Sequence, residues 1–302
     1  MNPLFSIIIP CRNESLDIAN TIEACLLINY EPKEIIIVDD STDDTPSIVA
    51  QYRDRGVCLI HREKNSNGCC GARNMGMKEA NGEFIMLLNA DDLPNPDFLD
   101  QVMRHYNEGA DYVVVQSAVA NCTNKWARYL RAIELSAIAG DEAQEWSEGF
   151  TCRRSAVEKV GYIPGDFPIP FCRDWMLGAA LGKVGFKKVI DRSIVMNHVT
   201  AHEVHSFWKN QVWRATMWAP SSYYFMKRSI AMILTREIFK SGWRIIKGVL
   251  LIPHIRQAIR YSKLISGTSK ETASMLLVRY VQDFAFTVGA FKGIINLREM
   301  FK

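Results

Sequence analysis

Acidic and amide side chains follow two apolar runs of the sequence, where they could hold a cation or a polar ligand. Asp39 and Asp40 come just after the run EIIIV, and Asn89 and Asp91 come just after the run EFIMLL. A hard divalent cation that bridges phosphates prefers carboxylate oxygens, usually one or two from the protein, with waters and phosphates completing its shell. Asp91 alone could meet that requirement. The competing interpretation is a solvent-exposed acidic turn.

A glycine-rich segment surrounds one arginine. Gly68, Gly71 and Gly76 flank Arg73. Glycine lets the backbone approach a phosphate closely, and the guanidinium offers a fixed fork of hydrogen-bond donors. The segment therefore predicts a phosphate contact. The alternative is a helix start that packs closely on a sheet, which is compatible with phosphate binding.

The apolar runs alternate with segments of helical spacing. We expect strands over residues 5–10, 34–38, 57–61 and 83–88, separated by helices over 14–28, 47–55 and 72–80. We expect further helices near 126–138, 155–160 and 176–181, with strands near 112–117 and 187–190. Such alternation predicts parallel strands, and open parallel sheets bind ligands beyond the carboxyl ends of their strands. The side chains that fall there are Pro10, Asp39, Asp40, Asn89 and Asp91.

Composition and charge narrow the class of protein. Of the 302 residues, 48% are hydrophobic and 23% charged, which indicates a globular protein and excludes a disordered or fibrous one. Residues 221–302 hold 14 Lys/Arg and 4 Asp/Glu, whereas residues 1–220 hold 22 and 29. The basic tail suits an anionic partner, either nucleic acid or a membrane surface. The acidic body and the lack of a recognisable motif argue against nucleic acid.

The sequence also bears on location. The N-terminus has no basic region followed by a long apolar stretch, and no run of about 18 uncharged apolar residues occurs, so we expect neither a signal peptide nor a membrane span. The 8 cysteines show no metal-ligand spacing. We expect mostly buried free thiols in a reducing compartment, and hence a cytoplasmic protein.

Three segments together resemble a known family. They are SIIIPCRNE at 6–14, EIIIVDDSTDDT at 34–45 and NGCCGARNMGMKEANGEFIMLLNADD at 67–92. Their order and spacing resemble the inverting family 2 glycosyltransferases, over about residues 5–200. The resemblance implies an α/β, GT-A fold, Rossmann-like, with a mostly parallel sheet flanked by helices. We expect a catalytic domain at 1–205 and a basic helical extension at 206–302.

The resemblance implies a nucleotide diphosphate sugar as donor. Pro10, Arg12 and Glu14 would lie along the base and ribose, and Asp39 would accept a hydrogen bond from the base. Within the third segment, Gly68, Ala72, Arg73 and Asn74 match the family's G-x-x-x-A-R-N element. Two alternatives are structural: Pro10 ends a strand, and Asp39 caps the following helix. The donor-contact residues implied are Pro10, Arg12, Glu14, Asp39, Asp40, Gly68, Arg73, Asn89 and Ala90.

The family's D-x-D position carries an asparagine in place of its first acid. The resemblance implies that Asp91 binds the divalent cation, Mn²⁺ or Mg²⁺, and that Asn89 contacts the donor's ribose or sugar. Asp92 is instead expected to hold the loop. In some GT-A enzymes a histidine completes the metal shell, and His202 is favoured here over its neighbours His198 and His205.

The second half of the resemblance implies a catalytic general base. Arg173 stands where family members carry the first acid of a pair, and Asp174 keeps the second. Asp174 is therefore expected to take the proton from the acceptor hydroxyl, with Asp166 in reserve. A cation and Arg73 would stabilise the leaving diphosphate, so no enzyme nucleophile is needed. The structural alternative is that Asp174 caps the next helix.

The basic tail and two departures from the family pattern leave further readings open. Residues 223–261 mix apolar, aromatic and cationic side chains, which favours peripheral binding to an anionic membrane surface and a lipid-linked or surface-glycan acceptor. A helical cap on the catalytic domain is the alternative. Because Asn89 and Arg173 replace acids, a noncatalytic nucleotide-sugar-binding protein is the rival function. A sugar nucleotidyltransferase is the rival enzyme.

Overall fold

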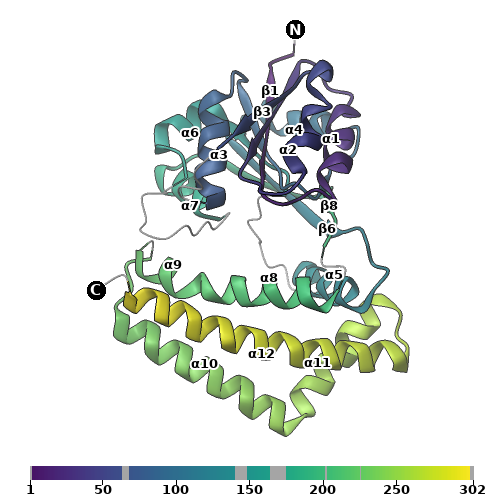
Figure 1. Ribbon diagram of the computed structural model, residues 1–302, viewed down its shortest axis with the longest axis vertical. Helices are drawn as coiled ribbons and strands as arrows, with labels where there is room; N and C mark the ends of the chain where they lie inside the picture. The colour runs from purple at the N-terminus through teal and green to yellow at the C-terminus, as the bar shows by residue number, and fades with distance from the viewer. Residues whose placement is uncertain are drawn as a thin grey trace. The chain divides into compact units, whose positions relative to one another are not determined.

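The computed structural model describes residues 2–62, 68–139, 148–163, 175–200, 203–224 and 226–299. Its contacts divide the chain into two compact units (Figure 1). The first comprises Met1–Ala120 and Ala143–Val199, and the second Asn121–Glu142 and Thr200–Lys302. One helix from the middle of the chain therefore belongs with the C-terminal helices. Each unit is described by itself.

A mixed, mostly parallel sheet forms the first unit. Its strands run in the order β3-β2-β1-β4-β7-β6-β8-β5. Parallel pairs join β1 to β2 and β4, β2 to β3, and β6 to β8, whereas β7 and β5 pair antiparallel with their neighbours. The strands are β1 (Phe5–Cys11), β2 (Lys33–Asp39), β3 (Val57–His61), β4 (Phe84–Leu87), β5 (Asp92–Leu93), β6 (Tyr112–Val119), β7 (Phe150–Arg153) and β8 (Lys188–His198).

Helices cover both faces of this sheet, so the expected α/β architecture is confirmed. Helices α1, α2 and α4 lie on one face and α3, α6 and α7 on the other (Figure 1). They are α1 (Ile18–Leu26), α2 (Thr45–Ala50), α3 (Gly68–Glu79), α4 (Phe98–Asn107), α6 (Arg154–Val160) and α7 (Trp175–Val184). A short 3-10 turn, η1 (Arg53–Arg55), precedes β3.

The central strand β1 explains why the two helical layers are needed. All seven of its residues are buried, because a parallel strand inside a sheet is covered on both faces. Ile7 and Ile9 join the core cluster that contains Ile18 of α1. On the other face, α3 approaches closely at Gly76, where an added Cβ would lie 2.4 Å from Cγ2 of Ile8.

The second unit is helical. It consists of α5 (Lys125–Ala139), α8 (Val204–Thr216), α9 (Trp218–Tyr224), α10 (Ile230–Leu250), α11 (Ile252–Ile265) and α12 (Ser269–Glu299). Tyr129 of α5 packs in a core cluster with Phe207 and Met275. Its hydroxyl donates to Gln282, whose amide in turn donates to Gln211. No helix among the described residues is long and apolar enough to cross a membrane.

Free cysteine thiols are present as expected, but fewer are buried than expected, because Cys58 and Cys69 are exposed. Six of the described ones carry free thiols, and Cys11, Cys25 and Cys152 among them are buried. Burial raises the pKa of all three buried thiols, which keeps them protonated. Cys70 differs, because it is disulfide-bonded.

Candidate active site

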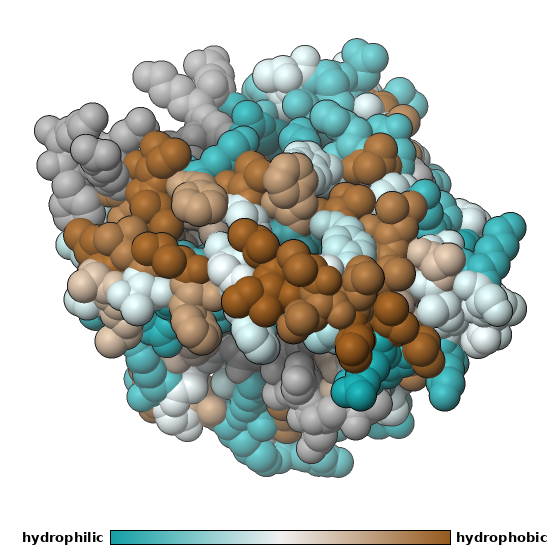
Figure 2. All heavy atoms as spheres, turned by 90° about the horizontal axis from the view of Figure 1, so that it is seen from below, coloured by the Kyte–Doolittle hydropathy of each residue, from teal (hydrophilic) through white to brown (hydrophobic). Residues whose placement is uncertain are grey.

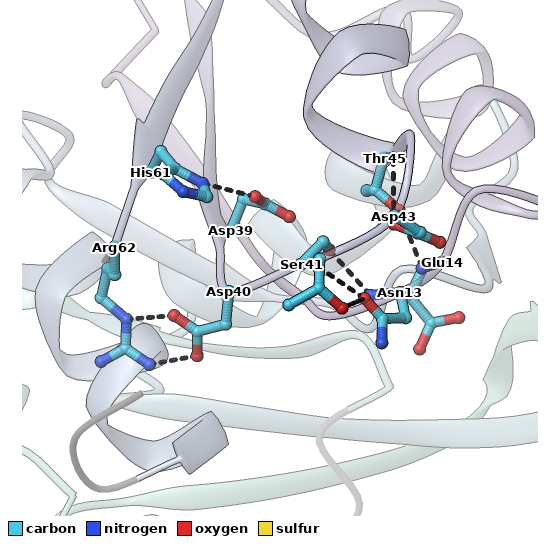
Figure 3. Close-up of polar contacts among 10 residues, drawn as sticks. Asn13, Glu14, Asp39, Asp40, Ser41, Asp43, Thr45, His61 and Arg62 are labelled. Carbon is cyan, nitrogen blue, oxygen red and sulfur yellow. Dashed lines mark hydrogen bonds and ion pairs between the residues drawn. The ribbon is translucent and has the colours of Figure 1, made fainter. Parts of the chain in front are cut away.

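The loops that follow β1 and β2 are tied together at the carboxyl edge of the sheet. Cys11 pairs with Asp39 in the parallel register, and the next amide, that of Asp40, donates to the Cys11 carbonyl at 2.9 Å. Asn13, with a φ of +58°, donates its amide to Oγ of Ser41 at 2.7 Å (Figure 3). These bonds hold the exposed Arg12 and the half-buried Glu14 at the edge where a ligand is expected.

Asp39 is a fully buried acid at this edge. Its side chain is 0% exposed, and its Oδ2 lies 2.8 Å from Nδ1 of His61 at the end of β3 (Figure 3). Its Oδ1 is buried and has no hydrogen-bond partner among the described residues. Asp39 does not cap α2: that helix begins after Asp44, and Asp43 accepts from the Thr45 amide. Oδ1 is thus a buried acceptor that lacks a donor within the part of the chain that the structure describes.

Asp40 forms a buried ion pair with Arg62. Nε of Arg62 donates to Oδ1 of Asp40 at 2.6 Å, and a terminal nitrogen of Arg62 contacts Oδ2. The same arginine donates to the Gly68 carbonyl at 3.0 Å. The pair therefore positions the first residue of α3, the glycine predicted to approach a phosphate. Arg62 was not among the residues singled out from the sequence.

The glycine-rich segment forms α3, and Arg73 lies within it. Arg73 is 2% exposed and donates to Oδ1 of Asn89 at 2.7 Å. The structure therefore brings together two of the residues expected at the donor. Asn74 exchanges hydrogen bonds with the backbone of Ile163, at 2.8 Å and 3.0 Å, and so anchors the chain that follows α6.

The loop after β4 is held by Asp92, as expected. Oδ2 of Asp92 accepts from the Asn89 amide at 2.6 Å, and Asp92 is fully buried. The Ala90 carbonyl accepts from Thr21 at 2.8 Å, and the Asp91 carbonyl accepts from the Val199 amide at 2.9 Å. With its backbone fixed on three sides, the loop presents the partly exposed side chain of Asp91.

Several other carboxylates act electrostatically on Asp91. Burial, followed by the nearby charges of Glu14, Glu148 and Asp17, raises its pKa to about 8. Burial and the charges of Asp91 and Glu148 likewise raise the pKa of Asp92 well above its ordinary value. Such a surplus of negative charge would suit a divalent cation, for which Asp91 could supply a carboxylate oxygen. Glu148, which directly precedes Gly149 and β7, was not identified from the sequence.

Three predicted residues, Asp166, Asp174 and His202, lie outside the described residues. Of the other two histidines, His198 contacts Oγ of Ser117 at 3.0 Å in the first unit, and His205 belongs to the second unit. Within the described ranges, no three His, Cys, Asp or Glu side chains converge as metal ligands. The structure therefore leaves the histidine ligand and the base as predictions.

The family model described as Glycosyl transferase family 2 matches residues 6–167. The uncharacterized glycosyltransferase YwdF of Bacillus subtilis is 30% identical over 182 residues, 58% of this chain and 67% of that protein. The poly-beta-1,6-N-acetyl-D-glucosamine synthase of Staphylococcus aureus is 31% identical over 171 residues, 53% of this chain and 42% of its own length. Other relatives are matched over only 39% or 33% of their length.

Two solved structures share the fold across both units. The mannosyltransferase PcManGT of Pyrobaculum calidifontis, in complex with GDP-Man and Mn²⁺, superposes with a TM-score of 0.59 at 17% identity, covering 100% of this chain and 88% of that one. TarS 1–349 of S. aureus, in complex with UDP-GlcNAc, gives a TM-score of 0.54 at 15% identity, covering 95% and 90%. At these identities the likeness establishes the fold.

Proposed function

Because the chain belongs to glycosyl transferase family 2, an enzyme family that moves sugars from nucleotide sugars, we propose that it inverts the anomeric centre while transferring a sugar from a nucleotide diphosphate to an acceptor hydroxyl. The observation that carries this proposal is the set of carboxylates around Asp91. Their mutual repulsion is relieved when a cation and the diphosphate it accompanies bind at that edge of the sheet.

The base of the donor binds at Asp39 in this proposal. The buried Oδ1 of Asp39 accepts a hydrogen bond from a ring N–H, and His61 keeps the carboxylate oriented through Oδ2. Uracil and guanine both carry such an N–H, and solved relatives of this fold hold UDP-GlcNAc and GDP-Man. Pro10, Arg12, Glu14 and Asp40 then line the base and ribose.

The diphosphate and the sugar lie along α3 and the loop after β4. Arg73, fixed by Asn89, faces the phosphates beside Gly68, and Asn89 and Ala90 contact the ribose or sugar. Asp91, with His202, holds Mn²⁺ or Mg²⁺, and the cation supplies charge neutralisation for the leaving diphosphate. Arg73 adds a second positive charge near that leaving group.

Asp174 acts as the general base. It removes the proton from the acceptor hydroxyl as the oxygen attacks the anomeric carbon opposite the departing nucleotide. One displacement inverts the configuration, so no protein nucleophile takes part. The acceptor we propose is lipid-linked or a surface glycan, reached at the cytoplasmic face of a membrane by a peripherally bound enzyme. The helices α10 and α11, described below, support the membrane part of this proposal.

A binding and turnover experiment tests the assignment. Wild type, Asp91→Asn, Asp174→Asn and the surface control Asp54→Asn are melted with UDP-, GDP- and dTDP-sugars, with and without Mn²⁺. We expect one nucleotide to raise the Tm of wild type and control only with Mn²⁺, because a ligand that binds the native state stabilises it. Asp91→Asn loses that shift.

Asp174→Asn separates chemistry from binding. We expect it to keep the thermal shift while donor turnover falls by about 10²- to 10⁴-fold, the usual contribution of a general base. No shift with any donor would overturn the donor site, and wild-type turnover in Asp174→Asn would overturn the base. The same turnover assay, run on Asp166→Asn, would then identify the reserve residue.

A further inference from the structure

One face of α10 is apolar and exposed. Met232, Phe239, Trp243, Ile246 and Leu250 recur at helical spacing, so they form a single stripe along the helix. All five are exposed, Phe239 to 72%. The opposite side of α10, which carries Ile233, Glu237 and Ser241, is buried against the rest of the second unit.

The stripe continues around the turn into α11. Val249, Leu250, Leu251 and Ile252 are four consecutive aliphatic residues, and all are about half exposed or more. Leu251 has a φ of +57°, a conformation that is strained for a bulky residue. On α11, Ile255 and Ile259 extend the exposed row from Ile252. The turn is thus a projecting apolar tip between two apolar helix faces.

Cationic side chains border this apolar surface on both helices. Lys240 and Lys247 occupy the row beside the α10 stripe, and Arg256, Arg260 and Lys263 occupy the row beside the α11 stripe. The one acid on the two helices, Glu237, is buried and pairs with Arg236 at 2.6 Å. Hence the exposed charge of α10 and α11 is positive.

We propose that the α10–α11 face, meaning the two apolar stripes with their flanking cations, binds the surface of an anionic lipid bilayer. The aliphatic tip and the stripes enter the boundary between headgroups and acyl chains, where Trp243 is also favoured, and the cations meet the anionic headgroups. Seen from below, the molecule shows a broad apolar band with hydrophilic side chains along its edges (Figure 2).

The positive charge of this face favours an anionic bilayer over a second copy of the chain as the binding partner. A symmetric contact across the same face would set cationic rows near each other, which opposes association. An anionic bilayer instead offers both an apolar layer and the opposite charge. The inference deepens the membrane part of the proposed function, but vesicle binding by the second unit does not depend on donor binding or transfer.

Vesicle cosedimentation of the full chain tests the face. The probes are vesicles of phosphatidylcholine alone and of phosphatidylcholine mixed with phosphatidylglycerol. We expect wild type to bind the mixed vesicles and to be released by high salt. Arg256→Gln with Arg260→Gln weakens binding on the order of twentyfold, because each surface cation contributes about fivefold. Arg53→Gln with Arg104→Gln, on the first unit, leaves binding unchanged.

A second variant removes apolar surface and keeps the charge. Phe239→Ser, Trp243→Ser and Val249→Ser together lower binding at least about tenfold, since they remove three large, exposed apolar side chains from the inserted surface. The control, Leu27→Ser with Val184→Ser, removes similarly exposed residues of the first unit and binds normally. Both variants keep the wild-type Tm and donor binding, which shows that they are folded.

Three results would overturn the proposal. Wild type that ignores phosphatidylglycerol vesicles excludes the bilayer. Undiminished vesicle binding by the apolar variant excludes the α10–α11 face as the site of contact. A dimer in light scattering that the apolar variant converts to a monomer assigns the face to a second copy instead. Vesicle binding without any donor-induced Tm shift would reject the proposed transfer and leave this inference standing.

Discussion

Oδ2 of Asp39 lies 2.8 Å from Nδ1 of His61, across the ends of the neighbouring strands β2 and β3. The contact uses one carboxylate oxygen and leaves Oδ1 buried without a donor among the described residues. A buried acceptor without a donor is rare in proteins, because it forfeits its hydration. A ligand that donates a hydrogen bond to Oδ1 would recover that loss. Asp39 is therefore the residue best suited to bind the nucleobase of the donor.

The first prediction concerns donor affinity. Asp39→Asn should weaken binding of the nucleotide diphosphate by about tenfold to a hundredfold, because a hydrogen bond to a charged group contributes about 1.5–3 kcal/mol. Titration calorimetry with the nucleotide identified by the Tm screen measures the loss. His61→Gln should cost less, since His61 contacts the other oxygen. Equal nucleotide affinity of Asp39→Asn and wild type would show that Asp39 does not bind the nucleobase.

The second prediction is a pH dependence of stability without metal. The folded-state pKa of Asp91 is about 8, above the ordinary value near 3.9, so folding takes up a proton between those values. The contribution of Asp91 to the free energy of unfolding is therefore fully present below about pH 4. It is lost as the pH rises through about 8, by up to about 1.4 kcal/mol per pH unit. Urea unfolding in a chelator, from about pH 5 to about pH 7.5, measures the slope.

Two comparisons test whether Asp91 causes this pH dependence of stability. Asp91→Asn should flatten the slope and raise the stability above neutral pH, because the repulsion with Glu14 and Glu148 disappears. Mn²⁺ should flatten it in wild type, since a cation favours the ionised carboxylate. A slope that survives in Asp91→Asn would move the effect to Asp92, whose pKa is also raised.

The third prediction concerns the buried ion pair under α3. Asp40 and Arg62 are 4% and 6% exposed, so Arg62→Met leaves an uncompensated buried carboxylate and should destabilise the fold by about 3–5 kcal/mol. Adding Asp40→Leu should restore most of that stability. The exposed pair Glu23–Arg55 is the control, and Arg55→Met should change little. Denaturant midpoints measure all four proteins.

The same experiment tests whether the pair positions the phosphate segment. Arg62 also donates to the Gly68 carbonyl, a contact absent from the double variant. The double variant should therefore fold but bind the nucleotide diphosphate more weakly than wild type, and so should Arg62→Met alone, which keeps the Asp40 side chain. If it binds equally well, the pair stabilises the sheet edge without positioning Gly68.

The sequence predicts the first half of the sheet well because its strands are apolar runs bounded by turns. β3 was expected at residues 57–61 and is found there. β1 extends the expected run by one residue at its end, and β2 extends it by one residue at each end. The residues at their carboxyl ends could be placed at one edge because parallel strands align in that direction. The ion pair between Asp40 and Arg62 could not be predicted from the sequence, because it depends on the pairing of β3 with β2, which brings Arg62 next to Asp40.

The second half was harder to predict. β7 is only four residues long and includes Thr151 and Arg153, so no apolar run marks it. It exists because it pairs antiparallel with β4 and β6, which are distant in sequence. Glu148 lies just before β7 and was not identified from the sequence, because no apolar run marks that strand. β8 runs to His198, well beyond the expected residue 190, because it follows β6 through an irregular register.

The last prediction tests the close packing of α3 on the sheet. Gly76→Ala would place a Cβ 2.4 Å from Cγ2 of Ile8 and 3.2 Å from Val38, so α3 must shift, which we expect to cost about 1–3 kcal/mol. Gly242→Ala in α10 meets nothing within 4 Å and should instead stabilise by about 0.5–1 kcal/mol.

A double-mutant cycle assigns the cost of Gly76→Ala to this contact. Ile8→Ala removes the clashing methyl group, so Gly76→Ala should be tolerated far better in that background than in wild type. The two unfolding free energies would then fail to add, with a favourable coupling on the order of 1 kcal/mol. Additive effects would show that the helix yields elsewhere. Because α3 carries Arg73, a shift of the helix should also weaken nucleotide binding, whereas Gly242→Ala should leave binding unchanged.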